Sequence, residues 1–292
     1  MNSKKGFAYF CRIPLWIYML LIVAFPMLYA LNISFRKFSF ALPGYNGQFV
    51  GLENYLRVFS DAQFWNSLRV TFIILAITIP LQLVLGFLTA SLLFKGLKGT
   101  RLFTSVILLP MTIAPIVVGL ISRLLLMDRF GLIAYYLERT GLFEDKSILG
   151  TPLTSLCAII TMDVWHWTSF MALIMLAGLQ ALPQEPYEAI KIDGGSRFQT
   201  TVYITIPLLL PIILTSVLLR VIDLFRIFDE ILILTGGGPG TSTESVEMFT
   251  YKVNFHNWDM GYGASIGIIT FLIVLAGSLS VLKLLGRGQT DQ

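Results

Sequence analysis

The chain has 292 residues, of which 55% are hydrophobic and only 13% are charged. Soluble proteins carry about a quarter charged residues, so this composition argues against a soluble domain and predicts an integral membrane protein. The net charge of +4 does not indicate a nucleic-acid partner, because the basic residues flank apolar segments and form no patch. The two cysteines and two histidines share no ligand spacing, so we expect no metal site and no cofactor.

Six apolar segments are long enough to cross a bilayer as helices, which takes about 20 residues each. They cover residues 14–35, 68–94, 102–126, 153–180, 206–234 and 264–285. Backbone polar groups must be satisfied within lipid, so the predicted fold class is an all-α integral membrane protein with six transmembrane helices. The first segment follows a charged start, as in a signal peptide, but no convincing cleavage site follows and we expect it to remain uncleaved.

Lysine and arginine positions predict the orientation of these spans. The short loop between the second and third spans holds Lys95, Lys98 and Arg101 and no acidic residue. Cytoplasmic loops are enriched in such cations, so we expect this loop and both termini in the cytoplasm. Cations in the outer loops are nearly balanced by acids, which weakens the bias without reversing it. The expected organisation is a cytoplasmic N-terminus at 1–13, a transmembrane domain at 14–285 and a cytoplasmic tail at 286–292.

The longest polar interruption in the C-terminal half covers residues 185–207 and would lie on the cytoplasmic side. Glu188 lies near the positive end of a short predicted helix, and Gly194 supplies the left-handed residue that ends it. Ser196 and Gln199 have capping-box spacing, so a second helix is expected to begin there and lead into the fifth span. The pattern predicts a short helix held at the membrane surface and joined rigidly to a span.

This loop resembles the EAA loop of bacterial ABC-importer permeases. Its Glu188-Ala189-Ile190, three residues, Gly194, nine residues and Ile204-Thr205-Ile206-Pro207 follow the family pattern of Glu-Ala-Ala, Gly and Ile-x-Leu-Pro at the same spacing. Ile190 and Ile206 depart from that pattern, and both are apolar replacements. The resemblance implies that the loop docks on a cytoplasmic ATPase subunit; an ordinary amphipathic linker is the alternative. The implied coupling residues are Glu188, Ala189, Asp193, Gly194, Ile204 and Pro207.

Two further runs are similar to ones in maltose-type (carbohydrate uptake) permeases. They are Gly-Leu-Glu-Asn-Tyr at 51–55, in the first outer loop, and Leu-Thr-Gly-Gly-Gly-Pro at 234–239, at the end of the fifth predicted span. The second run is not an ATP-binding loop, because it lacks the Gly-Lys-Ser/Thr ending that cradles phosphates. If ATP drives this protein, another polypeptide must bind it.

The resemblance implies a type I ABC-importer permease in the bacterial plasma (inner) membrane, for a sugar, oligosaccharide or polyol. A second homologous permease subunit, two cytoplasmic ATPase subunits and an external solute-binding protein are the partners it implies, beside membrane lipid. The chain itself would not be an enzyme. Movement of substrate would follow alternating access about a site near mid-membrane.

Charged residues within the predicted fifth span form a second candidate site. Arg220, Asp223, Arg226 and Asp229 alternate in sign at a spacing of three, with Glu230 beside them. Residues three apart can pair on a helix surface, so a self-neutralising structural ladder is one interpretation. A water-filled substrate path is the other, because ionisable residues within a membrane mark functional sites by default.

The fourth predicted span carries a complementary set on one helix face, formed by Asp163, His166, Trp167 and Phe170. Such acidic and aromatic groups can bind the hydroxyls and the apolar faces of a sugar. The predicted substrate-pathway residues are Asp163, Trp167, Arg220 and Asp223. A purely structural ion pair between Asp163 and Arg220 is the competing interpretation.

Three other functions remain open at this point. A glycerol-3-phosphate permease of the same family would need pathway arginines more than acids, and both are present. An intramembrane enzyme could use Asp163, His166 and Asp223 as acid–base groups, although the sequence contains no protease or transferase motif. A passive channel would have no use for a docking helix.

Overall fold

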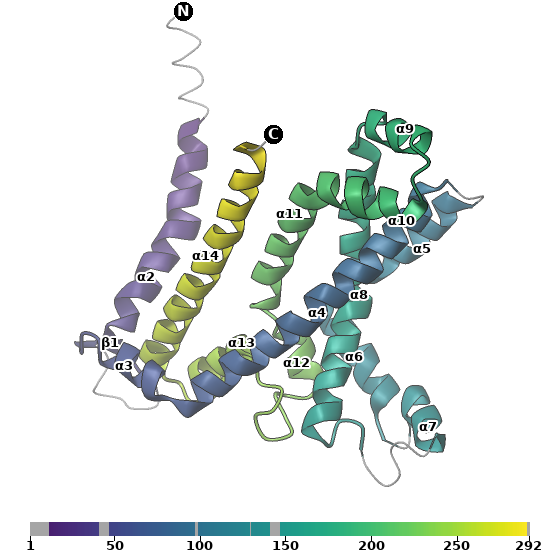
Figure 1. The fold of residues 1–292 in the computed structure, drawn as a ribbon. Coiled ribbons are helices and arrows are strands. Elements are labelled where there is room, and N and C mark those ends of the chain that lie inside the picture. The colour runs from purple at the N-terminus through teal and green to yellow at the C-terminus, as the bar shows by residue number, and fades with distance from the viewer. Residues whose placement is uncertain (1–11, 41–46, 97–98, 129, 141–146, 291–292) are drawn as a thin grey trace, which may run out of the picture. The chain divides into compact units, whose positions relative to one another are not determined.

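The structure is a computed structural model that describes residues 12–40, 47–96, 99–128, 130–140 and 147–290. The chain is predominantly helical (Figure 1) and divides into two compact units. Unit 1 comprises Met1–Trp65 and Phe249–Ile273, and unit 2 comprises Asn66–Met248 and Val274–Gln292. The predicted cytoplasmic cations Lys4, Lys5 and Lys98 lie outside the described residues.

Within the described residues, five helices are long and apolar enough to cross a membrane. They are Arg12–Ser34, Ala62–Phe94, Pro152–Ala181, Arg197–Leu224 and Met260–Lys283. Each overlaps one of the six predicted spans, which confirms the helical membrane-protein class. The sixth candidate is a bent pair of helices.

The predicted third span is wrong as a continuous helix. Helix α5 (Thr100–Thr112) and helix α6 (Pro115–Leu126) are bent by 94° at the break between them. Ile113 and Ala114 have extended backbones, with ψ of 135° and 138°. Pro115 has no N–H and disfavours a helical conformation in the residue before it, which accounts for the break.

The predicted fifth span, 206–234, is displaced toward the C-terminus, because the helix in the structure covers Arg197–Leu224. A π-helical turn, η2 (Thr201–Thr205), leads into α11 (Ile206–Leu224), where the helix ends. The chain then turns, and a separate short helix, α12 (Asp229–Leu234), follows. The proposed ladder of charges is therefore not one helical row, because only Arg220 and Asp223 belong to α11.

Unit 1 contains the first span, which includes η1 (Leu20–Ala24) and α2 (Phe25–Ser34). It continues through the antiparallel strands β1 (Arg36–Lys37) and β2 (Gln48–Phe49) to α3 (Glu53–Ser60). Gly51 takes a left-handed φ of 59° just before α3. The buried amide of Asn54 donates to the carbonyls of Ser34 and Arg36, so the Gly-Leu-Glu-Asn-Tyr run satisfies backbone groups at the C-terminal end of α2.

The last helix, α14 (Met260–Thr290), begins in unit 1 after α13 (Val246–Tyr251) and η3 (Lys252–His256). Arg57 of α3 pairs with Asp259 at 2.7 Å, and its guanidinium stacks over the ring of Tyr262, 3.9 Å from the centroid. Tyr262 in turn donates to Asp61 at 2.5 Å. These contacts fasten α3 to the start of the last helix.

Unit 2 is built around three long helices: α4 (Ala62–Phe94), α8 (Pro152–Ala181) and α11. Ala90, Met175, Leu179 and Leu209 form a buried cluster where these helices meet. Gly86 allows α4 to approach α8 closely, because a Cβ there would lie 2.7 Å from the Cβ of Met171. Close apolar packing therefore holds α4, α8 and α11 together.

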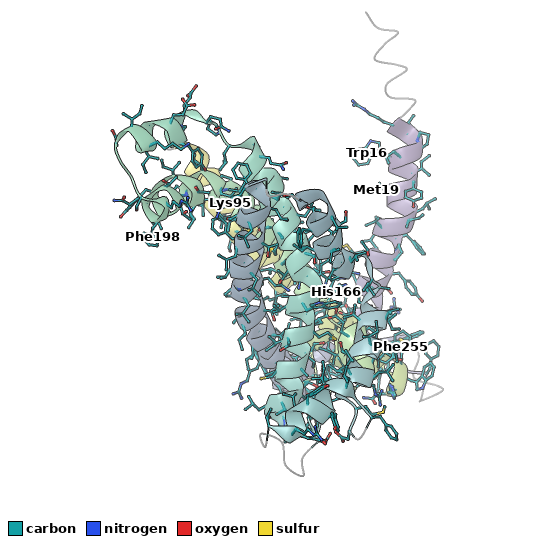
Figure 2. The ribbon with its side chains drawn as sticks, turned by 90° about the vertical axis from the view of Figure 1, so that its right-hand side faces the viewer. Trp16, Met19, Lys95, His166, Phe198 and Phe255 are labelled. Carbon is teal, nitrogen blue, oxygen red and sulfur yellow. The ribbon has the colours of Figure 1, made fainter. Side chains whose placement is uncertain are left out.

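Unit 2 also contains three short helices. Helices α9 (Glu185–Ile192) and α10 (Arg197–Thr200) lie together at one end of the unit (Figure 1). Lys95 lies near the same end as Phe198, well away from His166 (Figure 2). The loops expected on one side of the membrane therefore lie at one end of this unit. Helix α7 (Leu132–Arg139) follows α6.

Candidate functional site

A buried polar cluster joins α4, α8 and α11 in the interior of unit 2. Arg220 is 1% exposed, yet it donates through Nη2 to Asp163 Oδ2 at 2.7 Å and through Nε to Gln82 Oε1 at 3.0 Å. Its Nη1 donates to Asp223. A buried guanidinium requires such partners, because an unpaired charge would be expelled from a low-dielectric interior. The predicted Asp163–Arg220 ion pair is therefore present.

Gln82 is a member of this cluster that the sequence analysis missed. Its Nε2 donates to the backbone carbonyl and to Oδ2 of Asp163, at 3.0 and 2.9 Å, while its Oε1 accepts from Arg220. The amide thus uses both its donor and acceptor sides to hold the ion pair. A glutamine inside an otherwise apolar predicted span is the sequence signal that could have revealed it.

A pocket of about 190 Å³ opens beside this cluster. Its polar and aromatic lining comes from α8, α11, α12, the turn between α11 and α12, and the start of α6. The lining includes Pro115, Asp163, Trp167, Asp223, Arg226, Asp229 and Glu230. The side chain of Asp223 is 48% exposed, so its carboxylate is available to a molecule in the pocket even while it accepts from Arg220.

Trp167 contributes an aromatic wall to the pocket. The Arg220 guanidinium lies 4.8 Å from the centre of its ring, a cation–π distance. The Phe170 ring meets Trp167 edge-on, with centroids 6.0 Å apart. Of the four predicted pathway residues, Asp163, Trp167 and Asp223 line the pocket, and Arg220 lies behind them as their common partner.

His166, which shares the predicted face, takes a different role from Asp163 and Trp167. It is fully buried, with Nδ1 3.1 Å from Glu230 Oε1 and Nε2 3.0 Å from the Ile113 carbonyl. Its partner Glu230 is 3% exposed and lines the pocket. No sequence pattern predicts the contact of His166 with the Ile113 carbonyl, because it depends on the break between α5 and α6.

The EAA-like loop forms the helix, glycine break and second helix that its sequence predicts. Gly194 has φ of 72°, and its neighbour's amide donates to the Ile190 carbonyl at 2.9 Å, so α9 ends in a left-handed turn. Ser196 and Gln199 make both hydrogen bonds of a capping box at the start of α10. Local sequence therefore suffices to build this loop.

The loop presents its candidate coupling residues to the outside. Glu188, Ala189, Asp193, Gly194 and Pro207 are exposed, whereas Ile204 is half-buried within η2. Large apolar side chains are also exposed there: Ile192 at 86%, Phe198 at 75% and Tyr203 at 71%. Exposed apolar side chains grouped on a short loop are typical of a protein-interaction surface.

One hydrogen bond ties this loop to the span that follows. Tyr187 on α9 donates to the Thr205 hydroxyl at 3.1 Å, and Thr205 is the last residue of η2. Thr205 is buried, so the bond joins the exposed helix to the interior of unit 2.

Solved structures share this architecture. The chain superposes on a chain of a bacterial ABC transporter involved in the import of the acidic polysaccharide alginate, with a TM-score of 0.82 over 98% of this chain and 96% of that one. The sequence identity is 18%, so the likeness concerns the fold. An amino acid ABC transporter chain superposes less well, with a TM-score of 0.52 at 16% identity, over 82% of this chain and 99% of that one.

Sequence relatives are considerably more similar. The trehalose/maltose transport system permease protein MalF of Thermococcus litoralis is 38% identical, over 99% of this chain and 96% of its own. The sulfoquinovosyl glycerol transport system permease protein SmoG of Agrobacterium fabrum is 33% identical over 93% and 88%. The trehalose transport system permease protein SugA of Mycobacterium tuberculosis is 30% identical over 97% and 90%.

The family model of the binding-protein-dependent transport system inner membrane component matches residues 82–287. This match includes α5 to α12, the polar cluster and the EAA-like loop. Together with relatives that extend over nearly the whole chain, it shows that the chain belongs to the family of inner membrane components of binding-protein-dependent transport systems.

Proposed function

We propose that this chain is the permease subunit of an ATP-driven importer for a sugar, oligosaccharide or polyol. Relatives 30% or more identical over almost the full chain are named for trehalose, maltose and arabinooligosaccharides. The observation that carries the proposal is the exposed α9–Gly194–α10 loop tied to α11 in a chain of this family. An exposed loop that is attached to a span in this way suits a transporter in which a separate subunit hydrolyses ATP.

ATP hydrolysis belongs, in this proposal, to two cytoplasmic ATPase subunits. Glu188, Ala189, Asp193 and Gly194 would form the docking element, with Ile204 and Pro207 at its junction with the span. Closure of the ATPase dimer would move α9, and the Tyr187–Thr205 bond would pass that motion to α11. The permease itself performs no chemistry.

The remaining partners follow from the same proposal. A second homologous permease would complete the pore, and an external solute-binding protein would deliver the substrate. One structural neighbour, an alginate ABC transporter, was solved in complex with an alginate pentasaccharide-bound periplasmic protein. The described part of the chain buries none of the most apolar window of the first span, where Trp16 and Met19 project outward (Figure 2). Lipid and the second permease would cover this face.

The proposed location is the bacterial plasma membrane, with residues 14–285 forming the transmembrane domain. The segments 1–13 and 286–292 and the loop 185–207 would face the cytoplasm. Lys95, Arg197 and Lys191 lie in loops expected on that side, consistent with the enrichment of cations in cytoplasmic segments.

The pocket beside the polar cluster is the proposed substrate path. Asp223 can accept hydrogen bonds from sugar hydroxyls, and Trp167 can pack against the apolar face of a sugar ring. Asp163 and Arg220 would keep these groups in place, because their charges are already paired. In this proposal Asp163 and Arg220 form the structural ion pair, and Asp223 and Trp167 contact the substrate.

The rival functions are less well supported by this arrangement. An acid–base enzyme would need Asp163, His166 and Asp223 to converge, but His166 is buried against Glu230 and Ile113. A glycerol-3-phosphate permease is not favoured, because carboxylates predominate in the pocket lining and would repel an anion.

The first experiment is retention of the ATPase by the tagged chain, co-expressed with the second permease. We expect wild type to retain the ATPase and the Gly194→Pro, Glu188→Ala double variant to lose it. Lys191→Ala is the matched control, because Lys191 is exposed on the same helix outside the motif positions. If the double variant inserts normally and still retains the ATPase as well as Lys191→Ala does, the loop is not the docking element.

A second experiment tests the substrate path in the reconstituted complex. Asp223→Asn keeps the side-chain volume but removes a carboxylate from the pocket, and we expect the maximal rate of trehalose uptake to fall about tenfold, about 1.4 kcal/mol in the barrier. Asp229→Asn at the pocket edge is the comparison. Uptake by Asp223→Asn at the wild-type rate would remove Asp223 from the path.

A further inference from the structure

Helix α3 lies in unit 1 at the level where one span ends and another begins (Figure 1). The hydroxyl of its Tyr55 is 2.6 Å from the hydroxyl of Ser34, the last residue of α2. In its last turn, Arg57 pairs with Asp259, one residue before α14 begins. Helix α3 is therefore attached to the ends of the first and last spans, where a bilayer has its polar headgroups.

One face of α3 is apolar and exposed. This apolar face consists of Leu52 at the N-cap, Leu56 and Phe59, which fall within about 60° of the helix circumference. The three residues are 62%, 68% and 55% exposed, respectively. None of their side chains has a hydrogen-bond donor or acceptor, so a partner can meet this face only through apolar contact. Exposed apolar groups that lie together mark a surface that another molecule covers.

The rest of the helix circumference is either buried or polar. Asn54 and Val58 are buried and attach α3 to the remainder of unit 1. The side chains of Glu53, Arg57 and Ser60 are exposed and form a polar face. An apolar face beside a polar one is the arrangement of a helix that lies in the plane of a membrane interface, with one side in lipid and the other in water.

Tryptophan side chains beside α3 identify lipid as the molecule that covers its apolar face. Trp65 is half-exposed, and its indole Nε1 donates to the Phe59 carbonyl at 2.9 Å. Trp258, the neighbour of Asp259, is also half-exposed and meets Phe40 edge-on, with ring centroids 6.2 Å apart. Tryptophan collects at membrane–water interfaces, because its ring is apolar and its N–H reaches a polar group.

We propose that α3 is an interfacial helix whose apolar face inserts into one leaflet of the bilayer, the outer leaflet in the proposed orientation. None of the most apolar window of the first span is buried, so the apolar face of α3 continues a surface that is already open to lipid. Since α3 is attached to the end of α2 and to the start of α14, its insertion holds the ends of both spans at the depth of the headgroups.

The test is site-directed spin labelling of the complex, reconstituted in vesicles of phosphatidylethanolamine and phosphatidylglycerol. The labelled variants are Leu56→Cys, Phe59→Cys and Glu53→Cys, each in a chain that also carries Cys11→Ser and Cys157→Ser. Glu53→Cys is the matched control, because Glu53 belongs to the polar face of the same helix. The replaced residues are exposed, so each variant should keep the size-exclusion peak of wild type.

Power saturation compares how often each label collides with oxygen, which concentrates in lipid, and with a water-soluble nickel chelate. We expect the labels at 56 and 59 to lie about 5–10 Å deep in the boundary between headgroups and acyl chains. Their ratio of oxygen to nickel collisions should be several-fold higher than that of the label at 53. Equal ratios at the three positions would overturn the interfacial placement.

Protein partners predict different results from those of lipid. If the second permease covered the apolar face, the label at 56 would be shielded from both reagents, which would overturn the proposal. Adding the solute-binding protein should leave the ratios unchanged, and loss of oxygen access on its addition would overturn the proposal in favour of a protein-docking surface. The measurement needs neither ATP nor substrate, so its outcome does not depend on whether the proposed function is correct.

Discussion

Replacing Arg220 by methionine should destabilise the protein strongly. The substitution leaves the Asp163 carboxylate, 2% exposed, with Gln82 as its remaining side-chain donor and removes three hydrogen bonds that Arg220 donates. Breaking a buried ion pair by removing one partner costs about 3–5 kcal/mol, because the other charge stays buried without compensation. At roughly 2 °C or more per kcal/mol for a chain of this size, the melting temperature should fall by at least about 6 °C.

The assay is thermal unfolding of the detergent-purified complex, followed by loss of its size-exclusion peak after heating. Arg220→Met combined with Asp163→Leu should recover most of the loss, since exchanging a whole buried pair for apolar residues is often neutral. Asp223→Asn is the matched control: its half-exposed pair with Arg220 contributes less than about 1 kcal/mol. The reasoning is refuted if Arg220→Met unfolds at the wild-type temperature, or if the double variant is less stable than Arg220→Met alone.

Three further predictions use the same unfolding assay and ATPase retention. Gly86→Ala should cost about 1–3 kcal/mol by overpacking α4 on α8, whereas Gly277→Ala, with open space around it, should cost nothing. Gly194→Ala strains a left-handed residue by about 1–2 kcal/mol, so ATPase retention should weaken without loss of folding; unchanged retention contradicts this. Burial raises the pKa of Glu247, with Arg226 opposing, so wild-type stability should fall as pH rises from 4.5 through that raised pKa. Glu247→Gln should abolish this fall, and parallel pH curves for the two proteins would contradict it.

The spans and the EAA-like loop could be predicted because local sequence determines them. Apolar length fixed the five long helices to within a few residues at most ends, and the loop followed from Gly194 and the Ser196–Gln199 capping box. The two errors in span extent share one cause. Hydropathy does not distinguish a continuous helix from one that breaks at Ile113 or ends at Leu224, because apolar residues continue beyond each break, with a few charged residues among them after Leu224.

The polar cluster could be predicted only in part. Helical spacing predicts that Asp163 and Trp167 share one face of α8 and that Arg220 and Asp223 are neighbours on α11, and the structure has both arrangements. Spacing along the sequence does not predict which side chains of different helices contact one another. The roles of Gln82 and of Glu230 depend on where α4 and α12 pack, and sequence periodicity carries no information about that.

The breaks in the helices explain where many of the interior polar side chains are used. The Ile113 carbonyl meets His166, and the Ile227 carbonyl accepts from Ser245 at 2.7 Å. Without water, each released backbone group needs a donor from a side chain, so these residues are committed to holding the chain. Arg220 is committed likewise, to two carboxylates and an amide. The pocket groups left for a substrate are those at its edge, so we expect selectivity to rest on Asp223 and Trp167 and not on the buried pair of Asp163 and Arg220.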